Sequence, residues 1–242
     1  MAFEPFIHFV RGLQGKLNIG GLGGVQGHSF QQVAFLRQIQ RDLQQEDTLS
    51  IPLEALKVVV FDIETTGFFP DQGDEIISLG AVKVQGDKIL ENDVFYSLVQ
   101  YEKGLSSEVE ELTGLSPGIL KTAPPLAEVL IQFFEFSKGY PLVAHHANHE
   151  KSFMQHASWK LFRTPFKHRI VDTSFLYRIV DPNLAFTKLE EFCDYYQIPL
   201  INRHHALGDA LLTANLWTLY SKKIQQLGCH SLRDIYDHLA RF

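Results

Sequence analysis

Apolar residues in this chain fall into short runs in its first half and into helix-spaced patterns in its second half. The run from Val58 to Phe61 is rich in β-branched residues and leads into a polar stretch that Gly67 ends, which predicts a buried strand. Two further strands are expected at 75–84 and 89–100, separated by the turn residues Gly86-Asp87. Strands so close in sequence favour an antiparallel meander at the start of a sheet.

The second half of the chain alternates short strands with helices. Strands are expected at 141–144 and 169–173, and helices after Pro124-Pro125, at 150–161, 187–196 and 206–227, and from Ser231. Between the two halves, the stretch from 106 to 123 carries turn signals at Thr113-Gly114 and Ser116-Pro117-Gly118. This order predicts the α/β class, with a mixed sheet flanked by helices.

Residues 1–55 differ in character from the rest of the chain, and we expect an N-terminal extension there, a main domain at 56–223 and a short helical tail at 224–242. The glycines from Gly20 to Gly27 favour a hinge over a phosphate-binding loop, because their spacing does not fit G-x-G-x-x-G. From Ser29 onward, apolar residues at near-helical spacing predict an amphipathic helix, which would pack on the main domain or bind a partner.

Composition narrows the class of protein. The chain has 242 residues, of which 45% are hydrophobic, as is ordinary for a protein with a full core. Its net charge of −6 argues against broad coating of nucleic acid, but it does not exclude an enzyme that grips one strand end through metal ions. Cys193 and Cys229 have no CxxC spacing, so neither a disulfide framework nor a zinc ribbon is suggested. Because no signal peptide and no apolar run of about 18 residues is visible, we expect a soluble, cytoplasmic protein without a membrane partner.

Two carboxylates close the first strand. Asp62 and Glu64 leave the same side of it, because side chains alternate between the two faces of a strand. Crowded carboxylates repel each other unless a positive charge lies between them, and Mg²⁺ or Mn²⁺ prefers carboxylate oxygens. The alternative interpretation is an exposed acidic strand end without an ion.

Two later segments carry acids and histidines that could join this pair. The first, His145 to Glu150, follows a predicted strand at its carboxyl end, where α/β sheets place their sites. The second runs from Asn202 to Ala210 at the start of a predicted helix. A zinc ion held by His145 and His149 is a rival interpretation, although the segment lacks the His-Glu-x-x-His spacing.

Together, the three segments resemble the motifs of the DEDDh family of 3′–5′ exonucleases, which includes the epsilon proofreading subunit of DNA polymerase III. The motifs are Asp62 to Gly67, His145-x-Ala147-x-x-Glu150 and His204-x-Ala206-x-x-Asp209. Intervening marks at 112–115 and 171–173 agree, and the resemblance covers about residues 57–222. Each motif is weak alone, but their combination is specific.

The resemblance implies a ribonuclease-H-like fold and hydrolysis of a terminal phosphodiester with two divalent cations, Mg²⁺ or Mn²⁺. The residues that would hold the metal ions are Asp62, Glu64, Glu150 and Asp209. His204 would act as the general base on the attacking water, since the pKa of an imidazole lies near neutrality. The residues that would bind the substrate are Thr65, Thr66, Phe68, His145 and His149. An ordinary core position is the alternative for Phe68.

The second motif departs from the family pattern, which usually reads His-Asn-Ala-x-Phe-Asp. Here His146 replaces Asn, His149 replaces Phe, and Glu150 replaces Asp. Glu150 keeps the negative charge but extends the carboxylate by one methylene, whereas Mg²⁺ demands near-ideal geometry. A shift of the backbone, a preference for Mn²⁺ or reduced activity would be the consequence. An imidazole at position 149 would still be able to stack on a base.

We therefore expect a metal-dependent 3′–5′ exonuclease that releases nucleoside 5′-monophosphates from single-stranded DNA. The alternatives are an RNA-trimming enzyme of the same fold and a catalytically impaired nucleic-acid-binding or accessory module. The expected partners are a single-stranded 3′ end and a polymerase or another protein. Asp172 is interpreted as a helix cap and His205 as peripheral. The remaining histidines are expected at the surface or without a specific role: His8, His28, His156, His168, His230 and His238.

Overall fold

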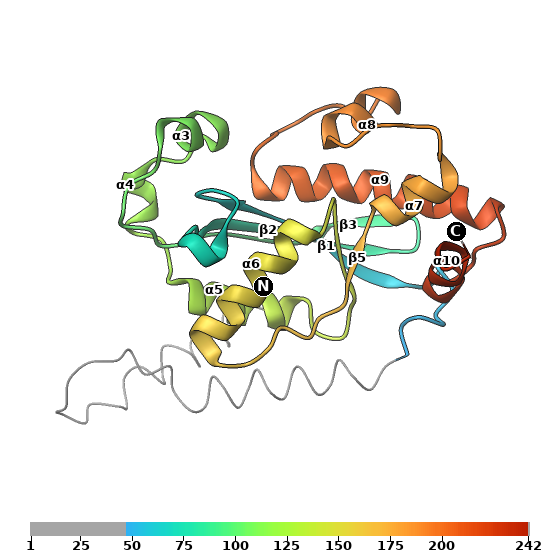
Figure 1. Ribbon diagram of the computed structural model, residues 1–242, viewed down its shortest axis with the longest axis horizontal. Coiled ribbons are helices and arrows are strands. Elements are labelled where there is room, and N and C mark those ends of the chain that lie inside the picture. The colour runs from blue at the N-terminus through green and yellow to red at the C-terminus, as the bar shows by residue number, and fades with distance from the viewer. Residues whose placement is uncertain (1–46, 242) are drawn as a thin grey trace.

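The computed structural model describes residues 47–241, which form a five-stranded sheet with helices on both faces (Figure 1). The strands are β1 (Lys57–Thr65), β2 (Ile76–Gln85), β3 (Lys88–Leu98), β4 (Leu142–Ala144) and β5 (Ile170–Asp172). Their order in the sheet is β3-β2-β1-β4-β5. The first three strands are antiparallel, whereas β4 and β5 continue the sheet in parallel with β1. The expected meander and the mixed sheet are both confirmed.

Helices cover both faces of this sheet, and α9 lies across one of them (Figure 1). The helical elements are η1 (Pro70–Gln72), α3 (Ser107–Thr113), α4 (Pro117–Leu120), α5 (Leu126–Phe136), α6 (Asn148–Phe162), α7 (Ser174–Val180), α8 (Leu189–Tyr195), α9 (Ala206–Gln226) and α10 (Leu232–Leu239). Residues of β1 alternate between two cores. Val59 and Phe61 pack with residues of α5 and α6, whereas Val58 and Val60 pack with residues of α7, α8 and α9. Burial on both faces explains why this strand reads as a continuous apolar run.

The stretch from 106 to 123, where the sequence indicates turns, contains the short helices α3 and α4. The Ser106 hydroxyl accepts the Val109 N–H at 3.3 Å, and Gly114 ends α3 with a left-handed φ of 69°. Pro117 is the first residue of α4. The turn signals of this stretch are therefore helix-capping residues, because the same residue types start and stop helices.

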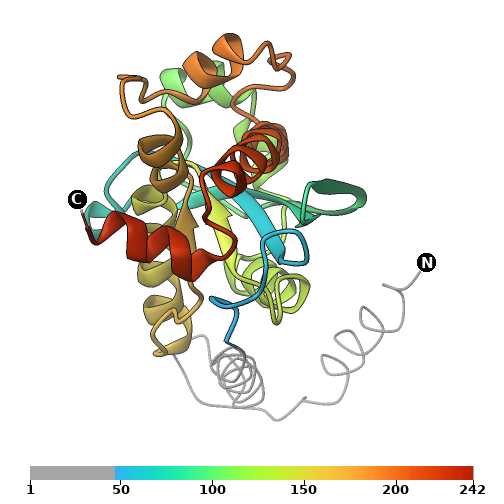
Figure 2. The ribbon, with the colours of Figure 1, turned by 90° about the vertical axis from the view of Figure 1, so that its right-hand side faces the viewer.

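The described part of the expected N-terminal extension packs against the C-terminal helix α10 (Figure 2). Leu53 and Leu56 are buried, the Leu53 N–H donates to the carbonyl of His230 at 2.8 Å, and Pro52 forms an antiparallel bridge with Ser231. The hinge and amphipathic helix expected between 20 and 43 lie outside the described residues. The expected boundary after 223 falls within α9, which ends at Gln226.

His168 differs from its expected surface position, because its side chain is only 8% exposed. Its ring stacks between Phe134 and Phe166, with centroid distances of 5.2 and 5.3 Å. Cys193 and Cys229 are buried free thiols. Within residues 47–241, no helix is long and apolar enough to cross a membrane.

Candidate active site

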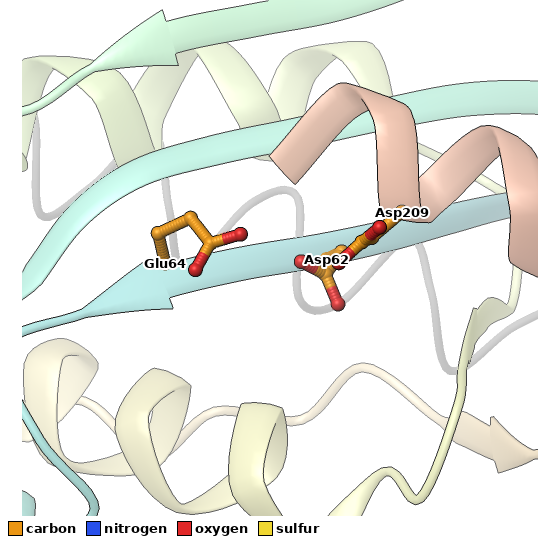
Figure 3. Close-up of side chains that lie close together, drawn as sticks. All are labelled: Asp62, Glu64 and Asp209. Carbon is orange, nitrogen blue, oxygen red and sulfur yellow. The ribbon is translucent and has the colours of Figure 1, made fainter. Parts of the chain in front are cut away.

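Three carboxylates from two distant segments meet on the face of the sheet that α9 covers. Asp62 and Glu64 lie on β1, and Asp209 lies in the first turn of α9. Each offers an oxygen within 4.8 Å of those of the other two. Figure 3 shows Asp62 and Asp209 beside each other, with Glu64 further towards the end of the strand. The structure thus brings together the expected ligands from the first and third motifs.

Glu150 approaches the same cluster from α6. It lies in the first turn of that helix with 4% of its surface exposed, and its Oε2 is buried without a hydrogen-bond partner among the described residues. Burial raises its pKa to about 8, and the negative charges of Asp172 and Glu64 add to this effect. A carboxylate that is buried beside other carboxylates, with one oxygen unpaired, is poised to receive a cation.

The electrostatics of the β1 carboxylates show the same excess of negative charge. Burial, together with the charges of Glu150, Glu64 and Asp209, raises the pKa of Asp62 well above its usual value. Glu64 is 9% exposed, and burial and the neighbouring Asp209 raise its pKa to about 7. Such shifts mean that burial and mutual repulsion oppose ionisation of Asp62, Glu64 and Glu150 unless positive charge enters among them.

Arg203 supplies one such charge, and the sequence interpretation assigns it no role. Its Nη1 donates to Asp209, and its Nη2 donates to Glu190 of α8 at 3.0 Å. Its charge opposes the rise in pKa at both Asp62 and Glu64. The sequence offers one signal for this residue: Arg203 is the only lysine or arginine between Asn202 and Ala210, and it stands directly before the two histidines of the third motif.

The loop before α9 places His204, which is the candidate catalytic residue of the third motif besides Asp209. His204, the expected general base, has a left-handed φ of 59°, and its backbone N–H donates to Asp209 Oδ2 at 3.3 Å. His205 is the N-cap of α9, and its Nδ1 accepts the Gly208 N–H at 3.4 Å. His205 thus caps the helix that carries Asp209, a structural role that the sequence interpretation does not assign.

Some of the expected substrate-binding residues gather at the end of β1. Thr65 Oγ1 lies 3.4 Å from His149 Nε2, and the ring of Phe68 meets that of His149 edge-on at 5.9 Å. Phe68 is 77% exposed, which excludes the alternative of a core position. Both threonine hydroxyls are also engaged within their own loop: Thr65 Oγ1 donates to the Gly67 carbonyl at 2.6 Å, and Thr66 Oγ1 donates to Asp74 at 3.2 Å and accepts the Glu75 N–H at 3.0 Å.

His145 points towards a different environment. Its Nδ1 lies 3.4 Å from Tyr177 Oη and 3.4 Å from Thr173 Oγ1, and its Nε2 lies 3.3 Å from the Thr187 carbonyl. Burial lowers its pKa to about 4. These contacts hold the turn after β4 in place, and among residues 47–241 the potential metal ligands that cluster are carboxylates rather than histidines.

Asp172 is the helix cap that the sequence predicts. Its Oδ1 accepts the Ser174 N–H at 2.8 Å, and its Oδ2 accepts the Ala147 N–H at 3.1 Å. It therefore orders the starts of α7 and α6 together. Because Glu150 lies in the first turn of α6, Asp172 also helps to place that carboxylate.

The fold and the acidic cluster define the class of ribonuclease-H-like nucleases. Residues 59–217 match the exonuclease family (RNase_T), and the chain belongs to that family. It is 38% identical to a protein named DNA polymerase III PolC-type from Caldanaerobacter subterraneus subsp. tengcongensis, over 73% of this chain but 12% of that protein. It is 33% identical to a DNA polymerase III subunit epsilon-like protein from Rhodobacter capsulatus, over 67% of this chain and 23% of that protein. The chain thus corresponds to a small part of these relatives.

Solved structures show the same fold at lower identity. The nuclease domain of 3′hExo, a DEDDh family member bound to rAMP, matches 72% of this chain and 94% of that chain with a TM-score of 0.61 and 21% identity. E. coli Exonuclease I in complex with a dT13 oligonucleotide matches 72% of this chain and 42% of that chain with a TM-score of 0.62 and 13% identity. The expected ribonuclease-H-like fold is confirmed.

Proposed function

We propose that this domain is a metal-dependent 3′–5′ exonuclease that hydrolyses the terminal phosphodiester of single-stranded DNA and releases nucleoside 5′-monophosphates. The observation that carries the proposal is the meeting of Asp62, Glu64 and Asp209, whose oxygens lie within 4.8 Å of one another. Membership of the exonuclease family makes phosphodiester hydrolysis the reaction that such a cluster would serve.

The residues present fit a pair of divalent cations, Mg²⁺ or Mn²⁺. The cluster consists of carboxylates, which are the ligands these hard ions prefer. Two of its oxygens, Glu150 Oε2 and Asp209 Oδ1, are buried without a hydrogen-bond partner among the described residues. Asp62, Glu64, Glu150 and Asp209 would hold the ions. Ions held there would lower the pKa of the attacking water and neutralise the charge that develops at the leaving 3′ oxygen.

The remaining residues supply proton transfer and substrate placement. His204 would take the proton of the attacking water, and its backbone hydrogen bond to Asp209 keeps it next to the acidic cluster. Phe68 and His149 would stack on the terminal base, since both rings lie at the end of β1 and Phe68 is largely exposed. Thr65 would contact the terminal nucleotide beside His149. Thr66 would contribute through its backbone in the loop, because its hydroxyl bonds to both Asp74 and the Glu75 N–H.

The relatives and the stacking site both bear on the substrate and partners. Both named relatives are DNA polymerase III proteins, which favours DNA over RNA and a polymerase as the partner protein. A cytoplasmic location, expected from the sequence, would suit that setting. Stacking of successive bases on exposed aromatic rings is typical of single-strand binding, so the exposed Phe68 favours a single-stranded 3′ end as the substrate.

The test is digestion of matched DNA and RNA oligonucleotides, labelled at the 5′ end, with Mg²⁺, with Mn²⁺ and with a chelator. We expect a ladder that shortens stepwise from the 3′ end, faster on DNA, and nucleoside 5′-monophosphates as the chromatographed product. Asp62→Asn and His204→Gln should each reduce the rate by about a hundredfold or more. Asp93→Asn, which changes an exposed acid on β3, is the matched control and should leave the rate unchanged.

Two results would contradict the proposal. Cleavage that begins at the 5′ end or within the strand would exclude the direction. Binding of metal and strand by the wild type without any cleavage would favour the catalytically impaired accessory module, for which Glu150 and His149 are the residues that depart from the family pattern. Glu150→Asp is the variant that would then be tested for recovered activity.

A further inference from the structure

A row of three residues crosses the sheet at the level of the acidic cluster. Asp62 on β1 pairs with Gly80 on β2, and Gly80 pairs with Tyr96 on β3. Directly paired residues point to the same face of a sheet, so Asp62 and Tyr96 flank a position without a side chain on the face that α9 covers. This row therefore contains a gap one residue wide beside the Asp62 carboxylate.

The backbone at the start of α9 fills this gap. A Cβ built on Gly80 would lie less than 3.0 Å from Leu207 N, from Leu207 Cα and from the carbonyl carbon of Ala206. These are backbone atoms of a helix, which cannot turn aside as a side chain would. A residue larger than glycine at position 80 must therefore push the start of α9 away from the sheet.

Tyr96 contacts the same helix start from the other side of the gap. Its ring stacks on His205 with a centroid distance of 4.3 Å and an interplanar angle of 23°, and it is 38% exposed. His205 is linked to the active-site acid, because its carbonyl accepts the Asp209 N–H at 2.9 Å. The distance between the α9 backbone and Gly80 and the stack of Tyr96 on His205 thus both influence the position of Asp209.

We propose that Gly80 and Tyr96 are positioning residues: the missing side chain at Gly80 sets the distance of α9 from β2, and the Tyr96–His205 stack fixes the start of the helix, so that Asp209 meets Asp62. This proposal rests on the proposed function for its effect on activity. Its effect on metal binding is independent of whether the bound metal serves hydrolysis.

The test compares Gly80→Ala, Tyr96→Leu and Tyr96→Phe with the wild type. Gly118→Ala is the matched control, because a Cβ at Gly118 meets nothing within 4 Å and its φ is not in the left-handed range. Mn²⁺ affinity is measured by isothermal titration calorimetry, folding by circular dichroism and thermal melting, and kcat and KM on a single-stranded oligonucleotide.

We expect Gly80→Ala to weaken Mn²⁺ binding about tenfold and to lower kcat about a hundredfold, because displacement of a reacting group by about 1 Å costs that much. KM for the oligonucleotide should change by less than about threefold, since Phe68 and His149 lie on other elements. Tyr96→Leu should weaken Mn²⁺ binding about fivefold, and Tyr96→Phe, which keeps the ring stack, should match the wild type. If Gly80→Ala does not fold, the difference in Mn²⁺ affinity between Tyr96→Leu and Tyr96→Phe tests the proposal.

The proposal is overturned if folded Gly80→Ala binds Mn²⁺ as the wild type does, or if Tyr96→Leu and Tyr96→Phe bind it equally. A rise in KM with unchanged kcat and metal affinity would also overturn it, because Tyr96 would then contact substrate. If the wild type cleaves nothing while Mn²⁺ affinity falls in the expected order, the proposed function fails and the positioning role of these residues stands.

Discussion

Acidification is expected to destabilise this domain through His168, which is not one of the candidate active-site residues. Its ring is buried between Phe134 and Phe166, and its Nδ1 has no hydrogen-bond partner among the described residues. Burial lowers the pKa of His168 to about 4, from a value near 6.5 in the unfolded chain. Between these two values the unfolded chain binds a proton that the folded protein excludes, so stability is lost as the pH falls through this window.

The magnitude depends on the width of the window. Each pKa unit corresponds to about 1.4 kcal/mol, so lowering the pH from 6.5 to 5 costs about 2 kcal/mol from this residue alone. His145, whose pKa burial also lowers to about 4, contributes in the same direction. A variant is therefore needed to separate the two histidines.

His168→Phe is that variant, because a phenyl ring preserves the stack and removes the titrating group. The Ser137 hydroxyl, 3.5 Å from His168, keeps its hydrogen bond to the Phe133 carbonyl at 2.8 Å. Urea unfolding at several pH values between about 7.5 and 5 should show that the variant loses about 2 kcal/mol less than the wild type between pH 6.5 and 5. An identical loss in both proteins, with equal m-values, would refute the reasoning that His168 excludes a proton in the folded state.

Three further predictions concern the metal site, the stacking site and the extent of the domain. Glu150→Gln should weaken Mn²⁺ binding roughly tenfold by calorimetry without lowering the melting temperature of the metal-free protein, whereas the exposed control Glu135→Gln should do neither. Phe68→Ala should raise KM for single-stranded DNA about tenfold while stability changes by less than about 0.5 kcal/mol, because the ring is exposed; an unchanged KM would remove Phe68 from the substrate site. Removal of residues 1–46 should leave hydrolysis of short oligonucleotides unchanged. Removal of residues 1–56 should destabilise the fold by at least about 3 kcal/mol, because buried Leu53 and Leu56 are lost; equal melting temperatures for the two truncations would contradict this.

The sheet and the acidic motifs could be predicted from the sequence because their signals are local. The apolar run at Val58 to Phe61 and the spacing of Asp62 and Glu64 depend only on strand geometry. The glycine and proline signals around 113–118 are local too, but they indicate turns as readily as helix ends, since the same residues stop and start helices.

What could not be predicted depends on contacts between segments distant in the sequence. The burial of His168 requires Phe134 from α5, and the contact of Arg203 with Glu190 requires α8 to lie beside the loop before α9. The need for glycine at position 80 becomes visible only when the backbone of α9 lies against β2. Nothing in the local pattern around His168 and Gly80 distinguishes them from ordinary surface or strand positions.

The bridge between Pro52 and Ser231 lies at the end of β1 opposite to Glu64. The first described segment and the start of α10 are therefore neighbours, on the side away from the carboxylates. The anchoring of the first described segment is thus provided by the last helix of the domain, which carries none of the catalytic candidates. A protein segment attached at that side would leave the carboxylates at the other end of β1 uncovered.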